Sequence, residues 1–193
     1  MKIYRIAFPL PLDTLAIEEG ENKVDNLLSE RDVQRLDSIY HFKNHLGGGS
    51  FGIAFSTFDG KVVKITTDRQ EYISALDLTG NTWQKYAPFV KFYKAFQLHK
   101  GVEVFVIVKD LVTPLTEEEQ NLFDIFTGEF NSDIDNVTEE FSGKKQLFEE
   151  FSDYIYDIQN YTQYADTLNV NNIGRNSEGT LVAFDPRKSN SMW

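Results

Sequence analysis

Short apolar runs separated by glycines and polar turns predict a β-sheet in the first half of the chain. Residues 45–66 have the pattern strand, glycine-rich turn, strand, tight turn and strand, with Asp59-Gly60 as the signal for the tight turn. Residues 89–98 and 102–108 alternate or run apolar and predict two further strands. We therefore expect five strands in one twisted antiparallel sheet.

Apolar residues at helical spacing predict helices before and after these strands. Residues 22–42 show this spacing, with Ser29 as a break or cap, and residues 68–78 predict a short helix packed on the sheet. A later helix is expected to start at Thr116, and residues 138–164 predict a long helix. Core packing explains the broad apolar stripe of that long helix.

Short strands are expected near both ends of the chain. Residues 2–10 favour a strand that prolines end, and residues 173–175 and 180–184 flank a turn. The whole pattern is that of an α+β protein. We expect an N-terminal extension, a sheet with one helix, and a helical unit, at residues 1–40, 41–110 and 111–193.

The composition is that of a globular protein with an aromatic core. The 193 residues are 41% hydrophobic and 14% aromatic, which is enough for one domain or two small lobes. The formal net charge of −11 argues against general binding to the phosphate backbone of nucleic acids. It is compatible with a basic protein partner or with solubility alone.

The absence of cysteine excludes disulfides and thiolate metal sites. The first residues lack the uninterrupted apolar core of a signal peptide, and no run approaches the roughly 20 apolar residues of a membrane span. We therefore expect a cytoplasmic protein without a membrane partner.

The glycine-rich hairpin and the lysine after it form a candidate anion site. Its glycines have the spacing G-x-G-x-x-G, but strand-like residues follow them, which argues against a dinucleotide-binding helix. Glycine lets backbone N–H groups approach an anion, and Lys64, inside an apolar strand, is costly to bury without one. A plain hairpin with Lys64 reaching solvent is the open alternative. The residues expected at a phosphate are Gly47, Gly49, Ser50, Phe51 and Gly52.

Glu71 has two compatible predicted roles. With Asp68 it forms a capping-box pattern at the start of the helix over residues 68–78. It also follows Lys64 by one strand end and one helix start, where its carboxylate can pair with the lysine.

Further motifs follow in a set order. The tetrapeptide K-D-L-V at residues 109–112 ends the sheet, N-I-G at 172–174 ends an asparagine-rich loop, and V-A-F-D-P-R spans 182–187. Together with the glycine hairpin and V-V-K at residues 62–64, this order resembles the protein-kinase-like superfamily. It is most similar to small phage-encoded serine/threonine kinase-like proteins, with D-P-R in place of D-F-G, and covers about residues 41–188.

The resemblance implies a bilobal fold, with a five-stranded antiparallel N-lobe carrying one helix and a reduced helical C-lobe. It implies ATP and Mg²⁺ as ligands. Glu71 would hold Lys64 at the phosphates, and Asn172 and Asp185 would bind the metal through oxygen. Residues 109–112 fall where the hinge to the adenine base would lie. The other residues implied at the nucleotide, besides the glycine tip, are Ala54, Val62, Asp110 and Val112.

The implied catalytic base departs from the family pattern. The base normally stands five residues before the metal asparagine, which is Thr167 for Asn172, whereas Asp166 is one place earlier. With Asn171 as ligand Asp166 would be in register, but the strand and the spacing to Asp185 support Asn172. Asp166 is the candidate base if the loop bulges, and otherwise it caps or breaks the preceding helix.

Two functions are therefore open. The first is an ATP/Mg²⁺-binding kinase-like protein that transfers phosphate to its own or a host protein's hydroxyl group. Only eight residues follow Asp185, so we expect no activation segment or peptide-binding subdomain. The alternative is an inactive pseudokinase-type protein that binds and inhibits a host protein through an acidic surface.

Overall fold

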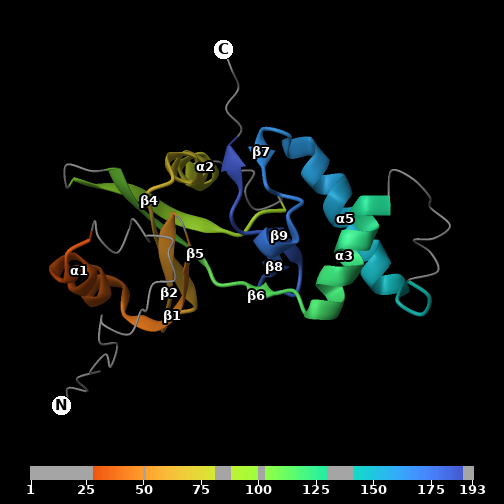
Figure 1. Cartoon of the computed structure of the whole chain (residues 1–193), viewed down its shortest axis with the longest axis horizontal. Helices are drawn as coiled ribbons and strands as arrows, with labels where there is room; N and C mark the ends of the chain where they lie inside the picture. The colour runs from red at the N-terminus through yellow and green to blue at the C-terminus, as the bar shows by residue number, and fades with distance from the viewer. Residues whose placement is uncertain (1–27, 50, 81–87, 100–102, 130–140, 189–193) are drawn as a thin grey trace.

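Five antiparallel strands form the main sheet, in the order β1-β2-β3-β5-β4 (Figure 1). This confirms the mixed α+β class and the five-stranded sheet. Gly60 in the β2–β3 turn has a φ of +78°, which glycine adopts without strain. The strands are β1 Phe42–Gly49, β2 Gly52–Thr57, β3 Lys61–Thr66, β4 Phe92–His99 and β5 Glu103–Asp110.

The computed structural model describes residues 28–49, 51–80, 88–99, 103–129 and 141–188. The strand predicted over residues 2–10 and Ser50 at the hairpin tip lie outside these ranges. Within them, no helix has the length and apolar character needed to cross a membrane.

Alternate residues of the strands face opposite sides of the sheet. The side that we call the outer face is apolar and is covered by helix α1, Glu30–Tyr40, through Leu36. On the inner face lies helix α2, Arg69–Gly80, whose Tyr72 stacks on Phe105 with ring centroids 4.3 Å apart. The prediction of a sheet with one helix was therefore incomplete, because α1 covers the second face.

The ends of α1 follow from local chemistry. Ser29 precedes the helix as the predicted cap, and its N–H donates to Asp32 Oδ2 at 3.3 Å. The helix stops at Tyr40 because His41 has a left-handed φ of +54°. The prediction that this helix extends to residue 42 was wrong, since Phe42 begins β1.

The second half of the chain packs around α3, Glu117–Glu129, and α5, Lys145–Ile158 (Figure 1). As predicted, Thr116 caps α3, and Glu119 completes the capping box by accepting from the Thr116 N–H at 2.8 Å. The long helix is shorter than predicted. It begins after a turn at Gly143 and ends before a 3₁₀ turn, Gln159–Tyr161.

Short strands lie between the sheet and these helices. β8 pairs with both β6 and β9, and β7 pairs with β10. The predicted strands 173–175 and 180–184 are confirmed as β8 and β9, whereas the two-residue strands are too short to show a period. The bounds are β6 Thr113–Pro114, β7 Tyr164–Ala165, β8 Ile173–Arg175, β9 Leu181–Ala183 and β10 Arg187–Lys188.

Backbone hydrogen bonds connect β9 to the segment that precedes β4. The Val90 N–H donates to the Ala183 carbonyl and the Ala183 N–H donates to the Pro88 carbonyl, both at 2.9 Å. Because Asp185 follows two residues after Ala183, these bonds place it against the inner face of the main sheet.

Candidate functional site

A cavity of about 230 Å³ lies where β3, the start of α2 and the short strands meet. It brings together seven residues that the sequence singled out, although they are spread over more than a hundred positions. Two further residues complete its lining. The nine are Phe51, Gly52, Lys64, Asp68, Glu71, Asp166, Asn172, Asp185 and Arg187.

Lys64 lies between two carboxylates. Its Nζ is 2.8 Å from Glu71 Oε1 and 2.6 Å from Asp185 Oδ2. Its side chain is only 19% exposed, so the interpretation that Lys64 reaches freely into solvent is wrong. Burial alone would lower the pKa of Lys64, but Glu71 and Asp185 outweigh it and raise the pKa above its ordinary value.

Glu71 serves the lysine and not the helix cap. Asp68 does cap α2, since Oδ1 accepts from the N–H groups of Gln70 and Glu71 at 2.9 and 3.3 Å. The Asp68 N–H, which a capping box would give to Glu71, donates to Thr66 Oγ1 instead. The second half of the predicted capping box is therefore wrong. Burial raises the pKa of the Glu71 carboxyl, and the nearby Asp185 carboxylate adds to the effect.

Asp185 is held by two ammonium groups. Oδ2 accepts from Lys64, and Oδ1 accepts from Lys109, which also donates to the Phe184 carbonyl. Burial alone would raise the pKa of Asp185, but Lys109 and Lys64 outweigh it and hold the pKa below its ordinary value.

Sequence reasoning missed the role of Lys109. The resemblance implied only that Lys109 stands in the segment where the hinge to the adenine base would lie. However, Lys64 pairs with Ile107 in the sheet, so Lys109 faces the same side as Lys64. The signal was available, because Lys109, like Lys64, is a lysine in an apolar strand.

The loop before β8 brings Asp166 and Asn172 close together. Asp166 has a left-handed φ of +63°, and its carbonyl accepts from the Asn169 N–H at 3.3 Å. A 3₁₀ turn, Val170–Asn172, then brings Asn172 back, so that its Nδ2 donates to the Asp166 carbonyl at 3.4 Å. Both side chains line the cavity.

The alternative register for the metal asparagine does not fit this loop as well. Asn171 is exposed, and its Nδ2 donates to Asn169 Oδ1 at 3.3 Å. It is not among the cavity-lining residues, whereas Asn172 is. The structure therefore favours Asn172 as the predicted residue that faces the site.

Arg187 lines the cavity, and its side chain is partly exposed. One guanidinium nitrogen, Nη2, is 2.6 Å from Asp68 Oδ2, and the other, Nη1, is 3.8 Å from Asp166 Oδ2. The guanidinium carbon also lies 5.6 Å from the centroid of the Phe51 ring. Arg187 thus connects the glycine hairpin, the start of α2 and the Asp166 loop, a role that sequence reasoning did not assign.

The glycine hairpin is anchored above the cavity. The Phe51 carbonyl accepts from the Thr67 N–H at 2.7 Å and from Thr66 Oγ1 at 3.0 Å. A Cβ on Gly52 would lie 2.4 Å from the Ile65 carbonyl oxygen, so glycine is required there. The remaining predicted nucleotide residues are not among those that line this cavity, namely Gly47, Gly49, Ala54, Val62, Asp110 and Val112.

The donor atoms of the site suit a hard divalent cation. Asp166, Asn172 and Asp185 offer oxygens to one cavity, which are ligands that Mg²⁺ accepts. Within the described ranges, no cluster of three or more acidic, histidine or cysteine side chains can hold a metal without help. Mg²⁺ is commonly bound by one or two carboxylates together with phosphate oxygens of a substrate, so the residues fit that mode.

The lining also has a charge pattern that a ligand must match. Lys64 and Arg187 are cationic, but each is already paired with a carboxylate. An anion alone would have to compete with these carboxylates for the cationic groups, whereas a divalent cation that arrives with the anion could bind a carboxylate and release its cationic partner to the anion.

A scan of protein-family models finds no match to this chain, and no curated protein shows significant sequence similarity to it. The site is therefore interpreted from its own geometry and chemistry.

Proposed function

We propose that this cavity binds ATP together with Mg²⁺ and that the chain is a small phosphotransferase with a protein-kinase-like bilobal fold. The observation that carries the proposal is Lys64, which sits between Glu71 and Asp185 although Asp185 is 121 residues away in sequence. An ordered lysine between two carboxylates, beneath a glycine hairpin, is an arrangement suited to holding phosphates.

Each residue then has a definite role. Lys64 binds the phosphates, and Glu71 keeps its ammonium group directed at them. Asn172 and Asp185 hold Mg²⁺, which would neutralise charge on the phosphates when bound. The hairpin residues Phe51 and Gly52 cover the phosphate side.

The base side of the nucleotide would lie beside the inner face of the sheet. The residues assigned there are Ala54 and Val62 on the strands, and Asp110 and Val112 on the segment after β5. Ala54 pairs with Lys64 in the sheet, and Val62 stands two residues before Lys64 in β3, so both face the same side as Lys64. A ligand that holds its phosphates at Lys64 can therefore reach them.

Asp166 is the proposed general base. Its side chain is 40% exposed at the cavity and lies beside Arg187, so an acceptor hydroxyl can approach it. The hydrogen bond from Asn172 Nδ2 to the Asp166 carbonyl supports this role, because it keeps the two residues close together. An acceptor proton would pass to its carboxylate as the hydroxyl attacks the terminal phosphate.

The phosphotransfer test uses radiolabelled ATP with Mg²⁺, the purified protein and a bacterial lysate. We expect label on the protein itself or on a lysate protein, and a rate about 10²–10⁴-fold lower for Asp166→Asn. Asp153→Asn, which changes an exposed aspartate on α5, is the matched control. Incorporation that is unchanged in Asp166→Asn would remove Asp166 from the mechanism.

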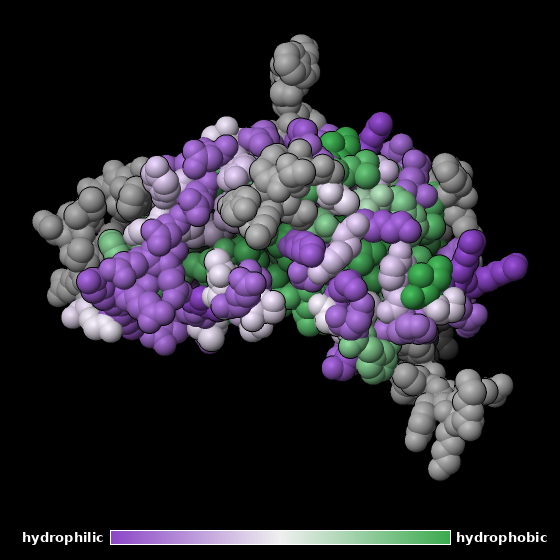
Figure 2. Space-filling view, turned by 180° about the vertical axis from the view of Figure 1, so that it is seen from behind, coloured by the Kyte–Doolittle hydropathy of each residue, from purple (hydrophilic) through white to green (hydrophobic). Residues whose placement is uncertain are grey.

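An inactive interaction protein of the same fold is the second candidate. It is favoured by the cleft itself, where Lys64, Lys109 and Arg187 are all paired with carboxylates of the chain. It is also favoured by the surface, because hydrophilic side chains cover the α3–α5 end of the molecule, at the left of Figure 2. That end includes the exposed Glu117 and Glu118 in the first turn of α3, which would contact a basic host protein.

A further inference from the structure

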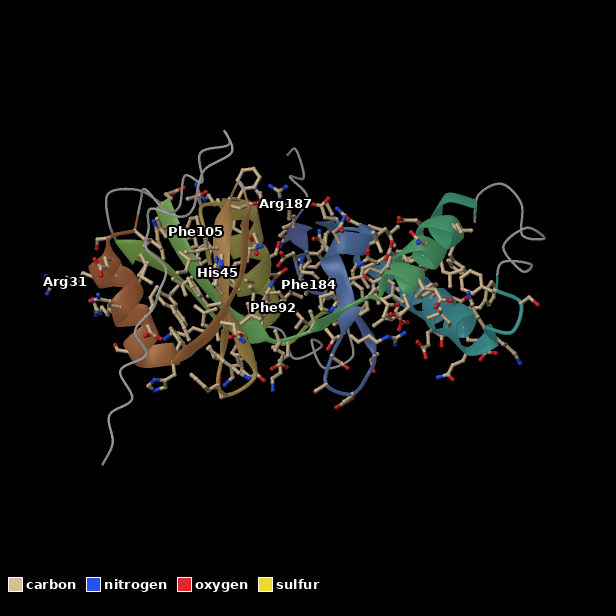
Figure 3. All side chains as sticks on the ribbon, turned by 60° about the horizontal axis from the view of Figure 1, so that its bottom comes forward. Arg31, His45, Phe92, Phe105, Phe184 and Arg187 are labelled. Atoms are coloured by element: carbon tan, nitrogen blue, oxygen red, sulfur yellow. The ribbon has the colours of Figure 1, made fainter. Side chains whose placement is uncertain are left out.

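Lys109 is a buried lysine with a complete set of partners. Its side chain is 5% exposed, and its Nζ contacts both Asp185 Oδ1 and the Phe184 carbonyl. The rings of Phe92 and Phe184 lie 5.9 and 5.4 Å from the same ammonium group (Figure 3). A buried ammonium is costly unless it is paired, so these contacts hold Lys109 in one place.

The two lysines approach Asp185 from different sides. Lys64 lines the cavity and takes Oδ2, whereas Lys109 takes Oδ1 and is not among the cavity-lining residues. Lys64 also pairs with Glu71, so it keeps one carboxylate partner when a ligand displaces it from Asp185. The described contacts of Lys109 are one carboxylate, one carbonyl and two rings. Unlike Lys64, it therefore has no second carboxylate to pair with.

This arrangement limits what Asp185 can give to a metal ion. One carboxylate oxygen is taken by a fixed ammonium group, so a metal in the cavity can use only the oxygen that Lys64 now contacts. The positive charge of Lys109 behind the carboxylate also repels a divalent cation through a weakly screening interior. Phosphate oxygens would supply the missing negative charge.

We propose that the Lys109 ammonium group permanently occupies Asp185 Oδ1, in the place that a metal ion would otherwise take. Free divalent cations therefore bind the cleft weakly and enter it only with a phosphate ligand. This inference rests on the proposed nucleotide site, and it states how the entry of metal into that site is regulated.

The test compares metal binding without nucleotide in the wild type and in Lys109→Met. The variant leaves Asp185 Oδ1 buried and unpaired, so we expect a lower melting temperature in the presence of chelator. Mn²⁺ alone should then restore part of the loss, because the freed oxygen and Asn172 can bind it. Calorimetry with MnCl₂ should show at least about tenfold tighter binding than in the wild type, which corresponds to about 1.4 kcal/mol.

Two further variants make the result specific. Lys94→Met removes an exposed lysine from neighbouring β4 and should respond to Mn²⁺ as the wild type does. Asn172→Ala combined with Lys109→Met should lose the gained metal response, because its second ligand is gone. If Lys109→Met does not fold, Lys109→Gln tests the charge alone, because its amide can donate to Asp185 without a positive charge, and Mn²⁺ should again bind more tightly than in the wild type.

A wild type that binds Mn²⁺ as tightly as Lys109→Met, or a variant with no gain, would overturn the inference. Binding of MgATP to the wild type is measured separately. If MgATP does not bind while Lys109→Met gains a metal site, the proposed function fails and the role of Lys109 at Asp185 stands. If MgATP binds and no metal response is gained, the inference alone fails.

Discussion

The two faces of the five-stranded sheet use the same strands for different purposes. On the outer face, β3 and β5 present Val63, Ile65 and Val106, all fully buried with α1 in an apolar core. On the inner face, the same two strands present Lys64 and Lys109, both of which contact Asp185. The backbone is shared, so the difference lies in the side chains and their partners.

Apolar burial accounts for the outer face, whereas the inner face combines apolar burial with paired charges. Burying apolar side chains removes them from water and favours folding. Buried ion pairs, in contrast, are commonly no more stabilising than apolar side chains of the same size. The proposed nucleotide site gives a reason for placing a buried and a partly exposed lysine on one carboxylate.

The largest expected effect is from Asp185→Ala on the inner face. It removes the carboxylate that faces both lysines, so the free energy of unfolding should fall by about 3–5 kcal/mol, and MgATP binding should be lost. Urea denaturation measures the first effect and calorimetry the second. Asp153→Ala on the surface of α5 is the control, and a loss for Asp185→Ala as small as that of the control would contradict the role of the buried pairs.

A change on the outer face should separate stability from binding. Ile65→Ala opens a cavity in the apolar core, so we expect the free energy of unfolding to fall by about 2–5 kcal/mol. The affinity of the folded protein for MgATP should stay within about twofold, below 0.5 kcal/mol. Denaturation and calorimetry below the melting range check both. A large loss of MgATP affinity in Ile65→Ala would break the separation of the two faces.

The smallest expected effect is a dependence of stability on pH through Glu71. Burial raises its pKa above the ordinary value, so the folded protein keeps this proton to higher pH than the unfolded chain does. The free energy of unfolding therefore falls as pH rises between the ordinary and the raised pKa, by at most about 1.4 kcal/mol per pH unit. Asp185 has a lowered pKa, so its contribution is lost only at more acidic pH.

Glu71→Gln tests this dependence, because glutamine does not ionise. Urea denaturation gives the free energy of unfolding of both proteins at about pH 5 and about pH 8. Relative to the wild type, the variant should be more stable at the higher pH than at the lower one. A difference between the two proteins that does not change with pH would show that Glu71 has the same pKa in both states.

Local signals in the sequence were enough for most of the fold. The caps at Ser29, Asp68 and Thr116 and the five apolar runs identified the main helices and strands. The end of α1 was misplaced because the left-handed turn at His41 has no sequence signature. The strands β6, β7 and β10 have two residues each, so no period could reveal them.

The candidate site was predictable only for residues that belong to the ordered set of motifs. The order of motifs brought Lys64, Glu71 and Asp185 together before any geometry was known. The pairing of Arg187 with Asp68 joins two segments far apart in sequence, and no local pattern predicts it. Lys109 had a local signal, but its meaning depended on the strand register that places it beside Lys64.

The most direct test of the central claim is calorimetric titration of the wild type and Lys64→Met with MgATP. We expect the wild type to bind with a Kd of about 1 mM or tighter, and Lys64→Met to bind at least about tenfold more weakly, a difference of about 1.4 kcal/mol. Circular dichroism should show that both proteins are folded. Absence of binding heat and of a thermal shift for the wild type at millimolar MgATP would contradict the claim that this cleft is a nucleotide site.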